Sequence, residues 1–248
     1  MRRTSQPRAD YGIDAPPVIR NLILVGLASI TLGRAVRLAL AARQPLIARL
    51  VFLWGLLAGT SMLLTAGLML WSSRVGKLRE RERVLDQLGL CGDEVVLDVG
   101  TGRGLFLTAA ARRLSTGKAI GIDLWRSVDQ SGNLPSVTQA NAHIEGVADR
   151  VAVQTGDMRA LPFADASFDV VLASLAIHNV PDQAGRAKAV QEIARVLKPG
   201  GRVALLDFQR TEEYVDSLRN LGWQDVELSG LHWLMFPPVR LVRGRKPA

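Results

Sequence analysis

The sequence has few of the residues that mark several common kinds of functional site. Its 248 residues include one cysteine, Cys91, so no disulfide can form within the chain, which fits a reducing cytosol. We expect Cys91 to be a small buried residue, as free cysteines commonly are. No group of histidine, cysteine and acidic residues has the spacing of metal ligands, and no G-x-S-x-G is present. The sequence therefore predicts neither a disulfide framework nor a metal site.

Acidic residues are scarce in the first third of the chain. The formal net charge is +8, but residues 1–83 hold 13 of the 31 basic residues and only 4 of the 23 acidic ones. The remaining residues carry a net charge of −1. The excess basic charge thus lies beside apolar segments, which is typical of membrane flanks rather than of a nucleic-acid footprint. We expect a membrane, and no nucleic acid, among the partners.

Charge is missing altogether from Leu50–Trp71, a run of 22 residues. As a helix this run would be about 33 Å long, which matches the hydrocarbon core of a bilayer. The run at 18–40 is less clear because Arg20, Arg34 and Arg37 border or interrupt it, so it either spans the bilayer or lies in its interface. We expect an integral membrane anchor over residues 18–73, with helices at about 18–40 and 50–71. No cleavage site of a signal peptide stands out.

The segments around the anchor have contrasting compositions. Residues 1–17 are polar and predict a disordered or loosely bound tail, whereas 74–92 predict a juxtamembrane helix and linker. The basic cluster near Arg74 is the densest, so the positive-inside rule places the following domain in the cytoplasm. Arginines also flank the other ends of the apolar runs, so the position of the N-terminus stays open. Gly55 and Gly59 form a G-x-x-x-G that predicts helix packing, within the chain or in a homodimer.

Strand and helix patterns alternate in the remaining chain, over residues 93–248. Strands are predicted from Val95 and at 119–123, 151–155, 168–174, 202–208, 223–228 and 239–243, with helices at 105–114, 135–146, 182–197 and 211–221. This alternation implies an α/β domain with a doubly wound, mostly parallel seven-stranded sheet, in which the first strand is central.

The first predicted strand runs into a glycine-rich turn, V-V-L-D-V-G-T-G-R-G. Gly100, Gly102 and Gly104 occupy the first, third and fifth positions, whereas a dinucleotide fingerprint needs the first, third and sixth. A strand, a glycine turn and a helix N-terminus let a ligand contact bare backbone. Asp98 lies at the carboxyl end of the strand, where open α/β sheets bind ligands, and Asp123 at the end of the next strand can accept both hydrogen bonds of a ribose diol.

Four segments in this order resemble the class I methyltransferases that use S-adenosylmethionine (SAM): VLDVGTGRG, GIDLW, GDMRALPFADASFDVVLASLAIHNV and RVLKPGGRVALLDF. The resemblance covers about residues 84–248 and is greatest to the branch with quinone-biosynthesis and small-molecule enzymes. It implies SAM as the co-substrate, with its parts held by Asp98, Gly100, Thr101, Gly102 and Gly104 (methionine), Asp123 and Leu124 (ribose), and Asp157 and Met158 (adenine). It also implies that Ser174 and His178 face the reaction centre. The apolar runs are a departure, because the soluble family core does not need them.

The expected activity is methyl transfer from SAM to a small, lipophilic acceptor at the cytoplasmic face of a membrane. His178 could act as a general base for an acceptor that arrives protonated, or it could order its own loop. A non-catalytic SAM-binding membrane scaffold and a dinucleotide-dependent oxidoreductase are the alternatives. The apolar loop at 230–238 suggests that the acceptor enters from the bilayer. We expect residues 84–248 to fold alone, so a fragment that starts near Arg79 should be soluble and bind SAM.

Overall fold

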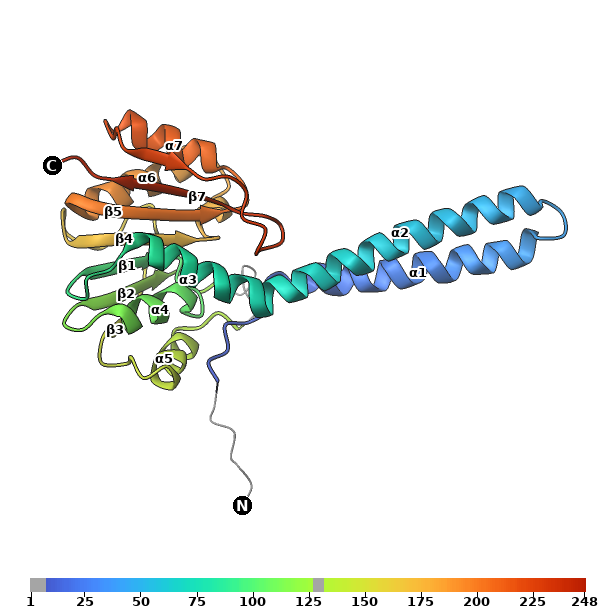
Figure 1. Cartoon of the computed structure of the whole chain (residues 1–248), viewed down its shortest axis with the longest axis horizontal. Coiled ribbons are helices and arrows are strands. Elements are labelled where there is room, and N and C mark those ends of the chain that lie inside the picture. The colour runs from blue at the N-terminus through green and yellow to red at the C-terminus, as the bar shows by residue number, and fades with distance from the viewer. Residues whose placement is uncertain (1–7, 127–131) are drawn as a thin grey trace, which may run out of the picture. The chain divides into compact units, whose positions relative to one another are not determined.

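The computed structural model describes residues 8–126 and 132–248, which divide into two compact units (Figure 1). Unit 1 combines the chain up to Gly12 with Lys77–Ala248, and unit 2 is Ile13–Gly76. Two segments from opposite sides of unit 2 in the sequence therefore belong to the same compact body.

Unit 1 is built on a seven-stranded sheet. Its strands are β1 (Val95–Val99), β2 (Lys118–Asp123), β3 (Val151–Thr155), β4 (Phe168–Ser174), β5 (Leu197–Asp207), β6 (Val226–Leu228) and β7 (Arg240–Arg245). They lie in the order β3-β2-β1-β4-β5-β7-β6, and only β7 is antiparallel to its neighbours. The predicted mostly parallel sheet is confirmed. β1 lies between β2 and β4, where the strand order reverses, so its carboxyl end is at the switch point that favours ligand binding.

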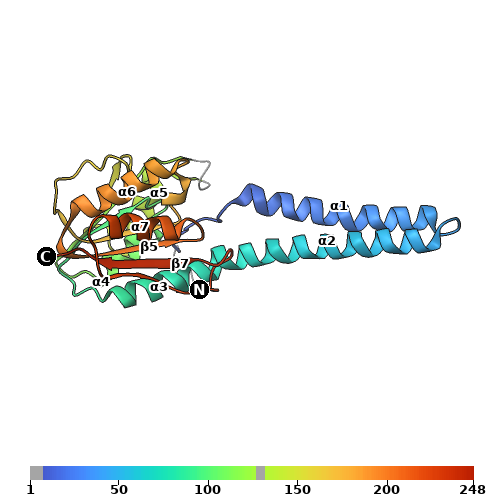
Figure 2. The same ribbon diagram turned by 90° about the horizontal axis from the view of Figure 1, so that it is seen from above.

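Helices cover both faces of this sheet, as Figure 2 shows for α3 and α6 on opposite sides of β5 and β7. One face packs against α3 (Lys77–Leu88), α4 (Leu105–Arg113) and α5 (Pro135–Ile144), and the other against α6 (Gln183–Val196) and α7 (Thr211–Asn220). Two hydrophobic clusters result, one on each face. This is the doubly wound arrangement that the alternating pattern predicts.

Some local predictions differ from the structure. β5 begins at Leu197 rather than at 202, so it includes the K-P-G-G segment that was expected to separate helix from strand. Cys91 is exposed, so the prediction that it is buried is wrong. Its backbone N–H donates to the buried Glu94 carboxylate at 2.8 Å, which leaves its side chain on the outside.

The end of the predicted loose tail is firmly packed in unit 1, so that prediction is wrong for residues 10–12. The Tyr11 ring is buried, and its hydroxyl bonds to Thr108 Oγ1 at 2.7 Å and donates to Glu145 Oε1 at 3.0 Å. Asn141 holds the backbone of Asp10 by two hydrogen bonds of 2.9 Å, one to its carbonyl and one from its N–H. We call residues 10–12 the N-terminal strap.

The strap is also tied to the start of α3. Lys77 is buried, and its Nζ donates to the carbonyl oxygens of Tyr11 at 2.9 Å and Gly12 at 2.8 Å. These bonds connect residues that are separated in the sequence by the whole of unit 2. Residues 1–7 of the predicted tail lie outside the described chain.

Unit 2 is a pair of helices followed by one π-helical turn. α1 (Pro16–Leu40) and α2 (Pro45–Trp71) are joined by a short loop, and η1 (Ser72–Gly76) follows. Both helices were predicted, and the second begins five residues earlier than the uncharged run. Small residues lie between them: Gly26 and Gly33 of α1 and Gly59 and Ala66 of α2 are buried. Backbones that approach this closely stabilise helix pairs without large side chains.

The G-x-x-x-G motif forms part of this packing. An ideal Cβ on Gly59 would lie 2.5 Å from the Gly26 carbonyl oxygen, and one on Gly55 would lie 2.6 Å from that of Ser29. Both glycines therefore face α1 of the same chain. Of the two predicted alternatives, packing within the chain is confirmed, and the homodimer through Gly55 and Gly59 stays a prediction.

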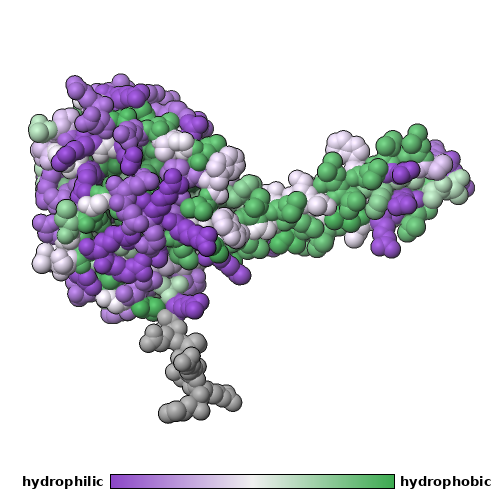
Figure 3. Space-filling model, in the orientation of Figure 1, coloured by the Kyte–Doolittle hydropathy of each residue, from purple (hydrophilic) through white to green (hydrophobic). Residues whose placement is uncertain are grey.

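The outer surface of unit 2 is apolar, as the green surface of its helices shows in Figure 3. Leu38 is 73% exposed and Trp54 is 72% exposed. The most apolar windows of the two helical segments have mean hydropathies of 1.7 and 1.8. By length and composition alone, both helices could cross a membrane.

Candidate functional site

The glycine turn between β1 and α4 is the centre of the candidate site. Gly100 has a φ of 72°, and an ideal Cβ on it would lie 2.3 Å from the Ala176 side chain. Only glycine fits this left-handed and crowded position. The N–H groups of Gly100 and Thr101 donate to the Ile122 carbonyl at 2.8 and 3.2 Å. The turn is thus fixed to β2 on one side and touches the segment after β4 on the other.

Asp98 stabilises this turn through a hydrogen bond with one of its side chains. Its carboxylate is buried and accepts a hydrogen bond of 2.8 Å from the Thr101 hydroxyl. Burial raises the pKa of Asp98 to about 7, because the charged form loses its hydration, and the nearby negative charge of Asp123 raises it further. The hydrogen bond from Thr101 acts in the opposite direction. Asp98 is therefore a carboxyl group that can change its charge near neutral pH.

Asp123 joins the end of β2 to the same turn. Its Oδ2 accepts the Gly102 N–H at 2.9 Å, and its Oδ1 accepts the Trp125 N–H at 2.6 Å and the Asn133 side-chain amide at 3.3 Å. The neighbouring Leu124 is 40% exposed. A carboxylate held in this way has a fixed direction, and a fixed acceptor can bind the hydroxyl pair of a ribose.

Side chains of α5 bind the carbonyl groups of the turn. The Thr138 hydroxyl donates to the Gly102 carbonyl at 2.7 Å, and the Asn141 amide donates to the Arg103 carbonyl at 2.9 Å. Asn141 is the residue that also holds Asp10, and Arg103 forms an ion pair of 2.7 Å with Asp10. The N-terminal strap and the glycine turn therefore share one set of polar contacts.

The predicted adenine residues lie in different surroundings. Met158 is partly buried, and its Cε would be 3.7 Å from an ideal Cβ on Gly100, so it adjoins the turn. Asp157 instead forms an ion pair of 2.6 Å with Arg159, whose hydrogen bond lowers the pKa of the Asp157 carboxyl. Asp157 remains ionised at neutral pH and keeps acceptor capacity for a second donor.

An acid, a histidine and a tyrosine meet beyond the carboxyl ends of β4 and β5. His178, in the short helix η2 (Ile177–Asn179), has its Nδ1 2.8 Å from Asp207 Oδ1, and its ring packs edge-on against Phe208 with centroids 4.7 Å apart. The other oxygen of Asp207 accepts the Tyr214 hydroxyl at 3.0 Å. Asp207 is buried and is held by the Tyr214 hydroxyl, whereas Nδ1 of His178 is close to it without a hydrogen bond of good geometry. Ser174, at the end of β4, is half-buried.

The structure thus joins Asp98 to Thr101 by one hydrogen bond and Asp123 to Gly102 by another, and it sets Gly100 against the segment that carries His178. The analysis of the sequence missed Asp207, although it ends a predicted strand as Asp98 and Asp123 do, and that position was the available signal. It also missed Asn141, for which the sequence offers no signal, because it acts on residues that are far away in the chain. Of the other histidines, His143 is exposed on α5 and His232 pairs with Glu80.

Comparisons with known proteins support one reading of this geometry. Residues 97–205 match the family described as "Methyltransferase domain". Over 134 residues the chain is 34% identical to a demethylmenaquinone methyltransferase of Lactiplantibacillus plantarum, which covers 54% of this chain and 53% of the relative. It is 38% identical over 114 residues to a ubiquinone/menaquinone biosynthesis C-methyltransferase of Geotalea daltonii, which covers 46% and 45%. The chain spans about half the length of the curated relatives that it matches.

Solved structures share the fold at lower identity. A SAM-dependent methyltransferase from Aquifex aeolicus has a TM-score of 0.53 and 22% identity, covering 68% of this chain and 90% of that one. The [4+2]-cyclase SpnF has a TM-score of 0.56 and 20% identity, covering 69% and 81%. These likenesses bear on the fold alone.

Proposed function

We propose that this chain, whose residues 97–205 match the methyltransferase domain family, transfers the methyl group of SAM to a small lipophilic acceptor at the cytoplasmic face of a membrane. The observation that carries the proposal is the glycine-rich turn after β1, which is fixed by Asp98 through the Thr101 hydroxyl and by Asp123 through the Gly102 N–H. The lipophilic acceptor is argued from the apolar surface of unit 2 and from the quinone names of the relatives.

The residues at the turn fit SAM. SAM supplies an activated methyl group on a sulfonium, together with a ribose and an adenine. The methionine part would contact the backbone at Gly100 and Gly102, and Thr101 would line it beside Gly104. Asp123 would accept the ribose hydroxyls next to Leu124. Met158 would pack on the adenine, which Asp157 would bind by a hydrogen bond, and Ser174 would adjoin the methionine end.

His178 is our candidate for the general base. Asp207 lies beside its Nδ1, which favours the tautomer that carries the proton there and leaves Nε2 free to accept one. The role of Asp207 would be to hold the ring and to stabilise the imidazolium once it forms, while Tyr214 fixes Asp207. Such a base matters only for an acceptor whose oxygen, nitrogen or carbon still bears a proton when it binds.

Unit 2 is our candidate for the membrane anchor. In a water-soluble protein the large apolar side chains would be turned inward, but here glycines and alanines are inside and leucines outside. That inversion is stable where the surroundings are lipid. Because the strap before α1 and Lys77 after α2 are bonded to each other, two crossings would return the chain to the side from which it started. The basic cluster that follows the second crossing argues for the cytoplasmic side.

The proposal is tested with the full chain in lipid vesicles and SAM that carries a labelled methyl group. Demethylmenaquinone is the first acceptor to try, followed by a total lipid extract, and label is counted in the organic phase. We expect label there with the wild type and none with Gly100→Val, whose side chain would overlap Ala176. Arg219→Gln, a change on the exposed end of α7, is the matched control and should retain activity. SAM binding without transfer to any lipid would instead support a scaffold.

A further inference from the structure

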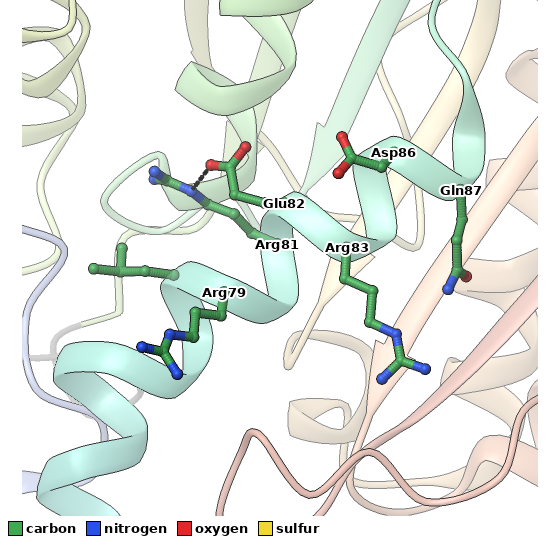
Figure 4. A pocket seen from close by; sticks show the side chains of 7 residues that line it. Arg79, Arg81, Glu82, Arg83, Asp86 and Gln87 are labelled. Carbon is green, nitrogen blue, oxygen red and sulfur yellow. Dashed lines mark hydrogen bonds and ion pairs between the residues drawn. The ribbon is translucent and has the colours of Figure 1, made fainter.

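The exposed side of α3 combines free positive charge with neighbouring apolar side chains. Arg79 and Arg83, one turn apart, are exposed, and among the described residues neither has an ion-pair partner. They line an open hollow on α3 whose other residues are Leu78, Arg81, Glu82, Asp86 and Gln87. Figure 4 shows both arginines extending from one side of α3, whereas Glu82 and Asp86 extend from the other.

The acids of α3 are not available to neutralise these arginines. Glu82 pairs with Arg112 and Arg113 of α4 at 2.8 Å, and Asp86 pairs with Arg113 at 2.6 Å. Their charges are therefore used to fasten α3 to α4. The opposite side of the helix keeps a net positive charge directly after unit 2 in the sequence.

A buried contact between a carboxylate and a histidine joins this helix to the apolar loop between β6 and β7. Glu80 is fully buried, and its Oε1 lies 2.5 Å from Nδ1 of His232. Backbone hydrogen bonds between His232 and Val239 close the loop, and Met235 packs into the core beneath it. Since Arg79 precedes Glu80 and Trp233 follows His232, this pair brings the basic residues and the loop together.

The outward residues of the loop are large and apolar. Trp233 is 72% exposed and Leu231 is 46% exposed, while His232 between them is buried. The underside of the loop is thus fixed to α3, and its outer side has no protein to cover it within the described chain. Tryptophan beside arginine is the pairing typical of the boundary between lipid headgroups and acyl chains.

We propose that Arg79, Arg83, Leu231 and Trp233 form a docking face of unit 1 that binds the surface of a bilayer containing anionic phospholipid. The two arginines would bind headgroup phosphates, and the two apolar side chains would enter the interface. A nucleic acid fits less well, because the rest of unit 1 has nearly balanced charge and the face includes an exposed tryptophan and leucine. This inference rests on the proposed membrane location, and it identifies the face of unit 1 that contacts the lipid.

The test places one fluorescent probe at the loop. Cys91 is the only cysteine and is exposed, so Cys91→Ser removes it, and Gly230→Cys supplies a new thiol at a position where a Cβ meets no atom within 4 Å. The labelled full chain is reconstituted in vesicles of phosphatidylcholine alone or with three tenths phosphatidylglycerol. We expect a blue shift of the probe emission only with phosphatidylglycerol, which salt reverses.

Substitutions then identify the residues responsible. Arg79→Gln with Arg83→Gln should weaken docking about fivefold for each arginine, and Leu231→Ser with Trp233→Ser should reduce the shift as well. Arg219→Gln is the matched control. An emission spectrum that is the same in both lipids, or a shift that survives loss of both arginines, overturns the docking face.

Flotation of the same vesicles separates this inference from the proposed function. A protein that floats with pure phosphatidylcholine but shows no shift with phosphatidylglycerol keeps its anchor and loses the docking face. A protein that floats only with phosphatidylglycerol keeps the docking face and loses the anchor.

Discussion

The carboxylate of Asp123 ties the end of β2 to the turn after β1, because its Oδ2 accepts the N–H of Gly102 at 2.9 Å. Replacing Asp123 with alanine should weaken SAM binding by about 1–3 kcal/mol, since ligand hydroxyls lose their acceptor and the turn loses a brace. Isothermal titration of the folded variant measures this. Asp123→Asn keeps one acceptor oxygen and should lose less. Unchanged affinity in the alanine variant would remove Asp123 from the site.

The pair of His178 and Asp207 should affect turnover more than binding. His178→Ala is expected to keep its affinity for SAM and to lower the rate constant of transfer about 10²–10⁴-fold, the usual contribution of a positioned base. Asp207→Asn should lower the rate less and should change the pH profile, because the ring is then no longer held by a carboxylate. Rates equal to the wild type with the true acceptor would make His178 a residue that only orders its loop.

Asp98 should make folding stability depend on pH. Its pKa is about 7 in the folded chain and about 3.9 in an unfolded one, so the folded state binds the proton more tightly. Its contribution to the free energy of unfolding is therefore complete below about pH 4 and is lost as the pH rises to about 7. Within that range the free energy of unfolding falls by up to roughly 1.4 kcal/mol for each pH unit. Urea titrations at several pH values measure the free energy of unfolding. The free energy of unfolding of the wild type minus that of Asp98→Asn should fall between pH 4 and 7. A difference that stays constant over this range would contradict the prediction.

The N-terminal strap should contribute to the stability of unit 1. Tyr11→Ala removes a buried ring and should cost about 3–5 kcal/mol, whereas Tyr11→Phe removes only the hydroxyl bonded to Thr108 and should cost about 0.5–1.5 kcal/mol. Near-ultraviolet circular dichroism during urea unfolding gives both values. If the alanine variant were as stable as the phenylalanine variant, the ring would not be packed as described.

The interface of α1 and α2 should tolerate change at one glycine and not at another. Gly59→Leu should lower the melting temperature of the helical signal in micelles, because its Cβ would overlap the Gly26 carbonyl and Ile30. Gly67→Leu is the matched control, since a Cβ there meets no atom within 4 Å. Light scattering should give the same molar mass for both variants. A molar mass of Gly59→Leu that is half that of the wild type would instead support a homodimer through this glycine.

The elements with a clear period were predictable, and the contacts between distant segments were not. β3 and β4 have the predicted bounds because alternation or continuous apolar residues define them. The turn at Gly100–Gly104 was found because its glycines are required by backbone geometry, which the sequence carries directly. Asn141 acts on Asp10 across 131 residues, and no local pattern encodes such a partner. The prediction that Cys91 is buried was wrong for a similar reason. The hydrogen bond from its backbone N–H to Glu94 decides its position, and not the hydrophobic preference of its side chain.

The bonds from Lys77 to the carbonyls of Tyr11 and Gly12 make unit 2 an insertion within a domain that is continuous in space. A fragment that starts near Arg79 would discard the strap and Lys77, and with them the contacts of Tyr11 with Thr108 and of Asp10 with Asn141, so we expect it to be less stable than the whole of unit 1, and its binding of SAM stays a prediction. Excision is the better route to a soluble enzyme. A lysine side chain spans the gap between Gly12 and Lys77, so about three or four flexible residues could replace 13–76. We expect the resulting chain to keep the strap, Lys77 and the glycine turn together without the two apolar helices.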